Sequence, residues 1–413
     1  MNTVRPPRLP RIPAGVLGNL AATSFRLALL FLVGREVASQ LGSQGIVVMG
    51  QLQNLLALGL ALASQALQPG IQQAIGSARP EQVSERSSWA LLSGQILALL
   101  SGLVVLQLSI SGAIYLPPQM HAAAWMLIPG LMAMAMMGNL QSIASGKGRL
   151  RQLNIFIALS GPLQALWLYF WIHGGLQGLV PGILLFGIVA LPLALWLMPP
   201  FPLSLPRRAQ WKEQARLWAP LAAMGSVVAV LSPYKLILFR ETILAQGVDV
   251  AGNWQAAVRI TDLLFATWSM AFTTWALPKL SGPEHLRPKF GKLLFGPLGG
   301  LALGISIAVA APWILDLAYV GRFPGALPVL RLQCLAEFVQ SCTMPLGLIL
   351  IARRSARVFA GLELGGAIVQ IALVRILVPH FGPIGAPIAI CIESTAYFAV
   401  ALWFVRRKGP VQE

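Results

Sequence analysis

Charged side chains inside long apolar segments are the residues of this sequence whose type and position could do chemistry. Six basic and four acidic residues share this setting: Arg26, Lys235, Arg240, Arg259, Asp262, Arg331, Glu337, Glu363, Arg375 and Glu393. A charge at the centre of a bilayer costs about 2.5–3.5 kcal/mol on insertion scales, so such side chains are expected to face the protein interior or water. Because arginine pairs with phosphate through two parallel hydrogen bonds, this net-positive set favours an anionic ligand.

Two positions carry the strongest expectation within this set. Arg26 lies near the middle of its apolar segment, and Arg259 is spaced i, i+3 from Asp262, so that pair can share one helix face. Arg240 and Arg375 lie close enough to segment ends for their side chains to reach the interface instead. The predicted ligand-binding residues are Arg26, Arg259, Lys235, Arg240, Asp262, Arg331, Glu337 and Arg375.

The elements that must position these side chains are membrane-spanning helices. The chain is 56% hydrophobic and only 10% charged, whereas a soluble domain carries about 25% charged residues. A spanning helix needs roughly 20 mostly apolar residues. The expected spans are 14–38, 45–75, 88–116, 121–145, 153–173, 176–198, 216–239, 251–278, 291–318, 325–351, 357–379 and 383–405. The sequence therefore predicts an all-α polytopic membrane protein with about twelve transmembrane helices.

The basic residues outside these spans predict the topology. They gather at the N-terminus, the C-terminus and every second loop, whereas loops such as 41–43 and 173–175 contain no lysine or arginine. By the positive-inside rule, both termini are expected in the cytoplasm. The apolar run that begins at Ala14 is too long for a signal peptide, so we expect it to be retained as the first helix.

An internal repeat divides the chain in two. At an offset of 207, residues 173–178 (HGGLQG) align with 380–385 (HFGPIG), and 194–197 (ALWL) align with 401–404 (ALWF). At an offset of 205, Arg35-Glu36 aligns with Arg240-Glu241. We therefore predict two six-helix lobes, 1–206 and 207–413, in parallel orientation with a cleft at their interface, as in transporters built from parallel repeats.

The sequence lacks the motifs that are typical of several other function classes. We find no nucleotide-binding glycine motif and no zinc pattern, so neither a cofactor nor a metal is expected, and the +17 net charge is attributed to cytoplasmic loops rather than to nucleic-acid binding. A glycan polymerase or ligase would need a large periplasmic loop. A major-facilitator transporter would carry a Gly-Asp-Arg-Gly-type loop, which is absent from 77–88.

Several stretches resemble a known family of transporters. They are 32–35 (LVGR), 41–45 (LGSQG), 252–256 (GNWQA), 259–262 (RITD), 277–280 (LPKL) and 380–386 (HFGPIGA). With them the chain resembles the Wzx-type lipid-linked oligosaccharide flippases, the O-antigen and enterobacterial common antigen translocases. These flippases belong to the multidrug/oligosaccharidyl-lipid/polysaccharide exporter (MOP) superfamily.

The resemblance implies a V-shaped, two-lobed bundle in the bacterial inner membrane. Its implied cargo is an undecaprenyl-diphosphate-linked oligosaccharide, moved from the cytoplasmic to the periplasmic face for lipopolysaccharide or related polysaccharide biosynthesis. Related flippases use cavity arginines in helices 1 and 8, and the matching positions here are Arg26 and Arg259. Besides this cargo and membrane lipids, a glycan polymerase and chain-length proteins are partners that the sequence leaves open.

One alternative of the same fold stays open at this stage. A multidrug/cation antiporter would need a cleft dominated by acids, and Asp262 and Glu393 keep that function in view. The sequence does not identify the glycan, the oligomeric state or the energy source. An inside-negative potential favours outward movement of an anion by about 2.3 kcal/mol per charge per 100 mV, so ion coupling is not required.

Overall fold

The computed structural model describes residues 14–76, 78–112, 114, 123–198, 208–281, 293–352 and 355–407. Helices make up nearly all of this part of the chain, and no strand occurs in it. Some predicted features lie outside the described residues. These are the basic N-terminal segment, the lobe boundary between 206 and 207, and the basic residues within 282–292.

The helices follow one another in the order that the apolar segments predict. The first half contains α1 (Ala14–Leu60), η1 (Ala61–Gln65), α2 (Gln68–Gly76), α3 (Pro80–Ile110), η2 (Ala124–Met126), α5 (Leu127–Gly146), α6 (Leu150–Ile172) and α7 (Gly175–Leu197). The second half contains α8 (Arg208–Leu244), α9 (Val248–Ser281), α11 (Phe295–Tyr319), α12 (Ala326–Ala352), α13 (Ala356–Phe381), η4 (Gly382–Ile384) and α14 (Gly385–Arg407).

The predicted count of twelve crossings is confirmed once α1 is divided. Gly42 has φ 60° and ψ −149°, which breaks the helix into a first arm, 14–41, and a second arm, 43–60. The second arm continues through η1 and α2, which together form the long second crossing. Eight stretches of the described residues are long and apolar enough to span a membrane, and two of them, Ala21–Gly76 and Arg357–Arg407, each hold two successive crossings. The more polar α8 and α9 complete the set.

The helix ends differ from the predicted ones in a consistent way. α8 runs from Arg208 to Leu244 and α9 from Val248 to Ser281, each longer than the apolar run that predicted it. α3 begins at Pro80, ahead of its apolar run, because proline is favourable in the first helical turn, where its missing N–H leaves no bond unmade. Hydropathy locates the membrane core, whereas backbone hydrogen bonding continues the helix into polar sequence.

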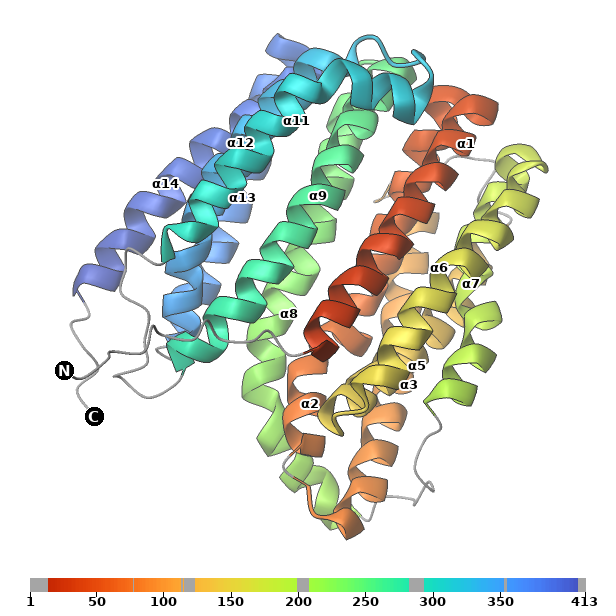
Figure 1. The fold of residues 1–413 in the computed structure, drawn as a ribbon, viewed down its shortest axis with the longest axis vertical. Coiled ribbons are helices and arrows are strands. Elements are labelled where there is room, and N and C mark those ends of the chain that lie inside the picture. The colour runs from red at the N-terminus through yellow and green to blue at the C-terminus, as the bar shows by residue number, and fades with distance from the viewer. Residues whose placement is uncertain are drawn as a thin grey trace, which may run out of the picture.

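The helices form two groups joined along a central seam (Figure 1). α11, α12, α13 and α14 lie on one side, and α2, α3, α5, α6 and α7 lie on the other. Both arms of α1 pack against α8 and α9 between these groups. One hydrophobic core includes Val37 and Met49 from α1 together with Ile237 from α8 and Trp254 from α9. The seam is therefore the place where charged side chains of both halves can meet.

The turns of the two halves share an unusual backbone conformation at equivalent positions. Gly42 and Gly247, at the offset of 205, have φ of 60° and 120°. Gly175 and Gly382, at the offset of 207, have φ of 68° and 65°. A left-handed φ favours glycine because other residues clash there. The two offsets found in the sequence are thus also the spacing of equivalent turns.

Candidate functional site

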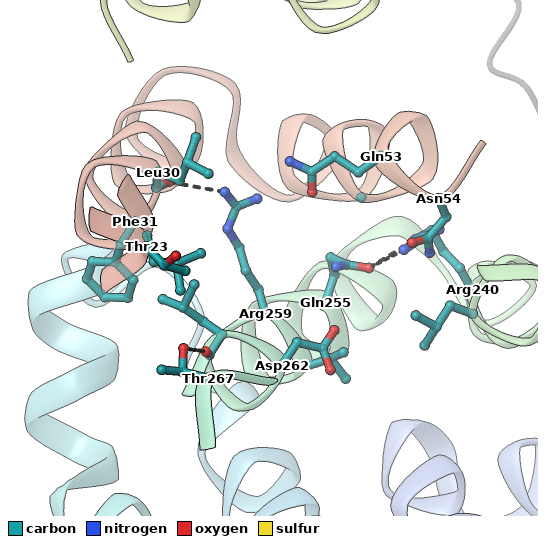
Figure 2. Close-up of a pocket in the computed structure, with 15 residues that line it drawn as sticks. Thr23, Leu30, Phe31, Gln53, Asn54, Arg240, Gln255, Arg259, Asp262 and Thr267 are labelled. Carbon is teal, nitrogen blue, oxygen red and sulfur yellow. Dashed lines mark hydrogen bonds between the residues drawn. The ribbon is translucent and has the colours of Figure 1, made fainter. Parts of the chain in front are cut away.

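A cavity of about 380 Å³ lies between α1, α8 and α9, on the seam between the two halves. Its polar lining comes from Thr23, Gln53, Asn54, Arg240, Gln255, Arg259, Asp262 and Thr267 (Figure 2). Both arms of α1 therefore contribute neutral side chains, and the charged ones come from α8 and α9. With two cations and one acid, the described wall has a net positive charge.

Arg259 crosses the cavity from α9 to α1. Its Nη2 donates to the carbonyl oxygen of Leu30 at 3.1 Å, and its Nη1 lies 3.3 Å from the sulfur of Met49. Figure 2 shows the guanidinium reaching the first arm of α1. Because the Leu30 carbonyl is neutral, this hydrogen bond does not neutralise the cation of Arg259, although Asp262 interacts with it electrostatically. The guanidinium can therefore still attract an anion.

Arg240 forms the other end of the wall and is only 1% exposed. Its Nη1 donates to Oε1 of Gln51 at 2.6 Å, and its Nε and Nη2 donate to Oε1 of Gln255 at 3.0 and 2.6 Å. The guanidinium carbon lies 5.8 Å from the centre of the Trp254 ring. Two amide oxygens and an aromatic face therefore hold this buried cation.

Asp262 is the acid of the cavity, one helical turn beyond Arg259 on α9. The side chain is solvent-accessible within the cavity. It interacts electrostatically with Arg240, Arg259 and Glu337. Glu337, on α12, accepts a hydrogen bond from Nε2 of Gln333 at 3.0 Å. The structure thus brings Arg240, Arg259 and Asp262 together, with Glu337 within electrostatic range.

An apolar groove of about 730 Å³ lies beside the cavity, between α1, α9 and α11. Four residues, Leu27, Phe31, Leu263 and Thr267, line both spaces. At the outer edge, Leu32 and Leu317 are 56% and 63% exposed. On a membrane-spanning bundle such exposed leucines face lipid, so the groove lies between the wall of the polar cavity and the membrane.

Arg26 lies on a different face of α1. Its Nη2 donates to Oε1 of Gln164 on α6 at 3.2 Å, and its side chain packs against Gly161. Its Nε is buried with no hydrogen-bond partner. The structure therefore places Arg26 between α1 and α6, outside the described cavity wall that contains Arg259.

The remaining predicted site residues lie elsewhere in the second half. Lys235, on α8, interacts electrostatically with Glu363 of α13 and Glu393 of α14. Arg331 is exposed on α12, with its Nε 3.4 Å from the carbonyl oxygen of Ala308. Arg375 is exposed on α13. None of these three lines the described part of the cavity.

Sequence reasoning missed the neutral residues of the site. Gln51 and Gln255 hold Arg240, and Gly34 and Gly50 leave space for the two guanidinium groups. Neutral amides and glycines occur throughout spanning helices, so their presence alone is no signal. Helical periodicity could have found Gln255, because it lies four residues before Arg259 and thus on the same face.

No family model matches the chain, and no curated protein matches it.

Comparison with solved structures gave clear matches along nearly the whole chain. A MOP superfamily transporter from Pyrococcus furiosus, reported with a binding pocket of reversed polarity, matches with 15% identity, 96% coverage of both chains and a TM-score of 0.64. A multidrug resistance MATE family transporter matches in its outward-facing form with 16% identity, 95% coverage of both chains and a TM-score of 0.65. An inward-facing MATE structure matches with 14% identity, 98% coverage and a TM-score of 0.64.

These matches define the fold. The chain has the twelve-helix fold of MOP superfamily transporters, and the neighbours that share it are transporters rather than enzymes. At this level of identity the likeness identifies no cargo, since one fold hosts many functions. The cargo must be argued from the residues of the cavity and the groove.

Proposed function

We propose that this protein is a flippase for an undecaprenyl-diphosphate-linked oligosaccharide. The observation that supports this proposal most strongly is the junction of two spaces. A cavity with Arg240 and Arg259 shares four lining residues with an apolar groove that reaches the lipid-facing surface. A ligand with a charged head group and a long hydrocarbon chain matches both spaces. Its head group suits the charged cavity, and its chain suits the apolar groove.

The head group is assigned to the cavity by its charge. A diphosphate offers acceptor oxygens to guanidinium groups, and charge-assisted hydrogen bonds are roughly twice as strong as neutral ones. Arg259 is the first candidate because its present acceptor is a neutral carbonyl. Thr23, Gln53, Asn54 and Thr267 offer hydrogen bonds that sugar hydroxyl groups could use.

The chain of the lipid is assigned to the groove by its polarity. Leucine, isoleucine and phenylalanine side chains dominate the groove, and its outer edge is exposed where the bundle faces lipid. A prenyl chain can therefore remain in a hydrocarbon environment while the head group crosses. A soluble drug would leave this groove without a role.

The same fold also supports a multidrug transporter, and one residue favours that function. Asp262 is accessible in the cavity and could attract an organic cation. Two arginines share the same wall, however, and they would repel such a cargo. The Pyrococcus furiosus neighbour was itself reported with a reversed-polarity pocket, so the superfamily fold is compatible with cavities of different charge.

The proposed direction of transport is the one that the family resemblance implies. With both termini in the cytoplasm of a bacterium, the cargo would move from the cytoplasmic to the periplasmic face of the inner membrane. In the cell, a glycan polymerase and chain-length proteins would then receive it.

A binding competition tests the proposal. The purified protein in lipid nanodiscs is titrated with undecaprenyl diphosphate, undecaprenol and the lipophilic cation tetraphenylphosphonium, with thermal unfolding as the readout. We expect the diphosphate to raise the unfolding temperature and undecaprenol to have little effect, because only the diphosphate can engage the arginines. Stabilisation by the cation alone would instead support the multidrug function.

A further inference from the structure

Two arginines of the second half are bonded to the first half at the seam. Arg240, on α8, donates from Nη1 to Oε1 of Gln51 in the second arm of α1, at 2.6 Å. Arg259, on α9, donates from Nη2 to the carbonyl oxygen of Leu30 in the first arm, at 3.1 Å. These two bonds, between Arg240 and Gln51 and between Arg259 and Leu30, are here called the arginine bridge.

Glycines of α1 allow the arginine bridge to form. A Cβ on Gly34 would lie 3.0 to 3.3 Å from the guanidinium atoms of Arg259. A Cβ on Gly50 would lie 2.8 Å from Nη2 of Arg240 and 2.6 Å from Cδ of Gln255. Any other residue at either position would displace a guanidinium group from α1. The close approach of the two halves therefore depends on the missing side chains.

The arginine bridge belongs to a larger contact at one end of the bundle, where α1 bends at Gly42 and α8 turns into α9. There, a Cβ on Gly252 would lie 2.6 Å from Cβ of Ser43, so the two backbones approach closely. Nη1 of Arg322 also lies 3.4 Å from the carbonyl oxygen of Ala38. The halves are thus held together at this end, which we call the Gly42 end.

The acceptors in the arginine bridge are an amide oxygen and a backbone carbonyl, and both are neutral. A phosphate in the adjoining cavity would be a stronger acceptor for the same N–H groups. A guanidinium that faces a phosphate with two parallel N–H groups must turn as a unit, because its five N–H groups are fixed in one plane, and it then gives up its bond to α1. Phosphate and α1 are therefore competing partners for Arg240 and Arg259.

We propose that a lipid diphosphate in the cavity binds Arg240 and Arg259 and breaks their hydrogen bonds to α1. The contact between the halves at the Gly42 end is then released. The proposal rests on the proposed function, because it uses that cargo at that site. In this proposal the ligand makes different contacts in the closed and opened states. Any ligand-driven conformational change requires such a difference. Binding and opening thus share the same two side chains.

A distance measurement across the Gly42 end tests the proposal. Spin labels are attached to Gln44→Cys and Val248→Cys, two exposed positions on opposite halves. Cys334, Cys342 and Cys391 are replaced by alanine in this variant. In nanodiscs, undecaprenyl diphosphate is expected to lengthen the distance between the labels by several ångströms, and undecaprenol is expected to leave it unchanged.

A second variant opens the contact without any ligand. Gly50→Ala should lengthen the same distance in the free protein, because the added Cβ collides with Arg240 and Gln255. Gly365→Ala is the matched control, since its added Cβ meets nothing within 4 Å. An unchanged distance in Gly50→Ala, with the protein folded, overturns the role of the arginine bridge.

The binding competition separates failure of this proposal from failure of the proposed function. If the diphosphate binds and the distance between the labels stays the same, the arginine bridge does not couple binding to opening, although the cargo assignment stands. If the diphosphate does not bind at all, both proposals are wrong.

Discussion

The dipeptides Arg35-Glu36 and Arg240-Glu241 occupy equivalent positions in the two halves, yet their arginines have opposite surroundings. Arg35 is exposed and lines the groove that reaches the lipid-facing surface. Arg240 is 1% exposed and bonded to Gln51 and Gln255. Each dipeptide precedes the left-handed glycine of its turn, Gly42 or Gly247. The difference therefore lies in what packs against each arginine rather than in the local backbone.

This contrast shows how the two halves differ at positions that the predicted repeat makes equivalent. Arg240 can be buried because Gly50 leaves space for it and two glutamines accept its hydrogen bonds. Arg35 has no such arrangement among the contacts described here, and it remains accessible. The first half supplies neutral acceptors and glycines to the seam, and the second half supplies the cations. The cavity is therefore asymmetric even though the fold is repeated.

The largest expected effect on ligand binding comes from removing the side chain of Arg259. Arg259→Ala should weaken binding of undecaprenyl diphosphate by about 10- to 100-fold, because a hydrogen bond to a charged group contributes about 1.5–3 kcal/mol. The affinity is measured by titration in nanodiscs. Arg375→Ala, an exposed arginine on α13 that lines neither the described cavity nor the groove, is the matched control and should change affinity less than twofold. Equal losses in both variants would mean that general charge, and not the cavity, attracts the ligand.

The second effect concerns stability. Arg240→Met should lower the free energy of unfolding by about 1–3 kcal/mol, because Gln51 and Gln255 would lose a buried partner. The exposed Arg35→Met change should stay within about 0.5 kcal/mol. Thermal unfolding in the same detergent compares the two variants. Similar unfolding temperatures would contradict the structural difference between the two arginines.

A smaller effect on affinity is expected from adding a single methyl group at Gly34. Gly34→Ala places a Cβ 3.0 Å from Nε of Arg259. The added Cβ pushes Arg259 away from its bond to Leu30, the partner that competes with phosphate, so diphosphate affinity should rise about three- to tenfold, since about 1 kcal/mol corresponds to roughly fivefold. Gly365→Ala meets nothing within 4 Å, and it should leave affinity unchanged. An unaltered affinity in Gly34→Ala would show that the bond to Leu30 does not compete with phosphate.

The smallest effect is expected at Arg26. Since this residue bonds Gln164 between α1 and α6, Arg26→Gln should change diphosphate affinity less than twofold. The measurement is the same nanodisc titration. A loss as large as that of Arg259→Ala would instead support the pairing of Arg26 with Arg259 that the family resemblance implies.

The fold could be predicted from the sequence to a large extent. Apolar runs located the twelve crossings because only a helix satisfies its own backbone hydrogen bonds in lipid. The offsets of 205 and 207 found the equivalent turns, since Gly42, Gly247, Gly175 and Gly382 all have positive φ. The ends of α8 and α9 were harder to predict because polar residues continue a helix as readily as apolar ones.

The site could be predicted only in part. Arg240, Arg259 and Asp262 were found because a charge in an apolar run is rare and costly. The orientation of Arg26 could not be found, because successive residues on a helix point about 100° apart and its neighbour Leu27 faces the cavity instead. The sequence could not predict the roles of four neutral residues, because those roles depend on contacts between the two halves. These residues are Gln51, Gln255, Gly34 and Gly50.

We propose that the arginine-lined cavity carries an anionic lipid across the membrane. The most direct measurement uses liposomes that contain a fluorescent prenyl diphosphate and a membrane-impermeant quencher added outside. With the protein present, all of the fluorescence should be quenched over time, at a rate well above that of protein-free or Arg259→Ala liposomes. Quenching of only the outer-leaflet lipid, at the same extent in all three samples, would contradict the claim.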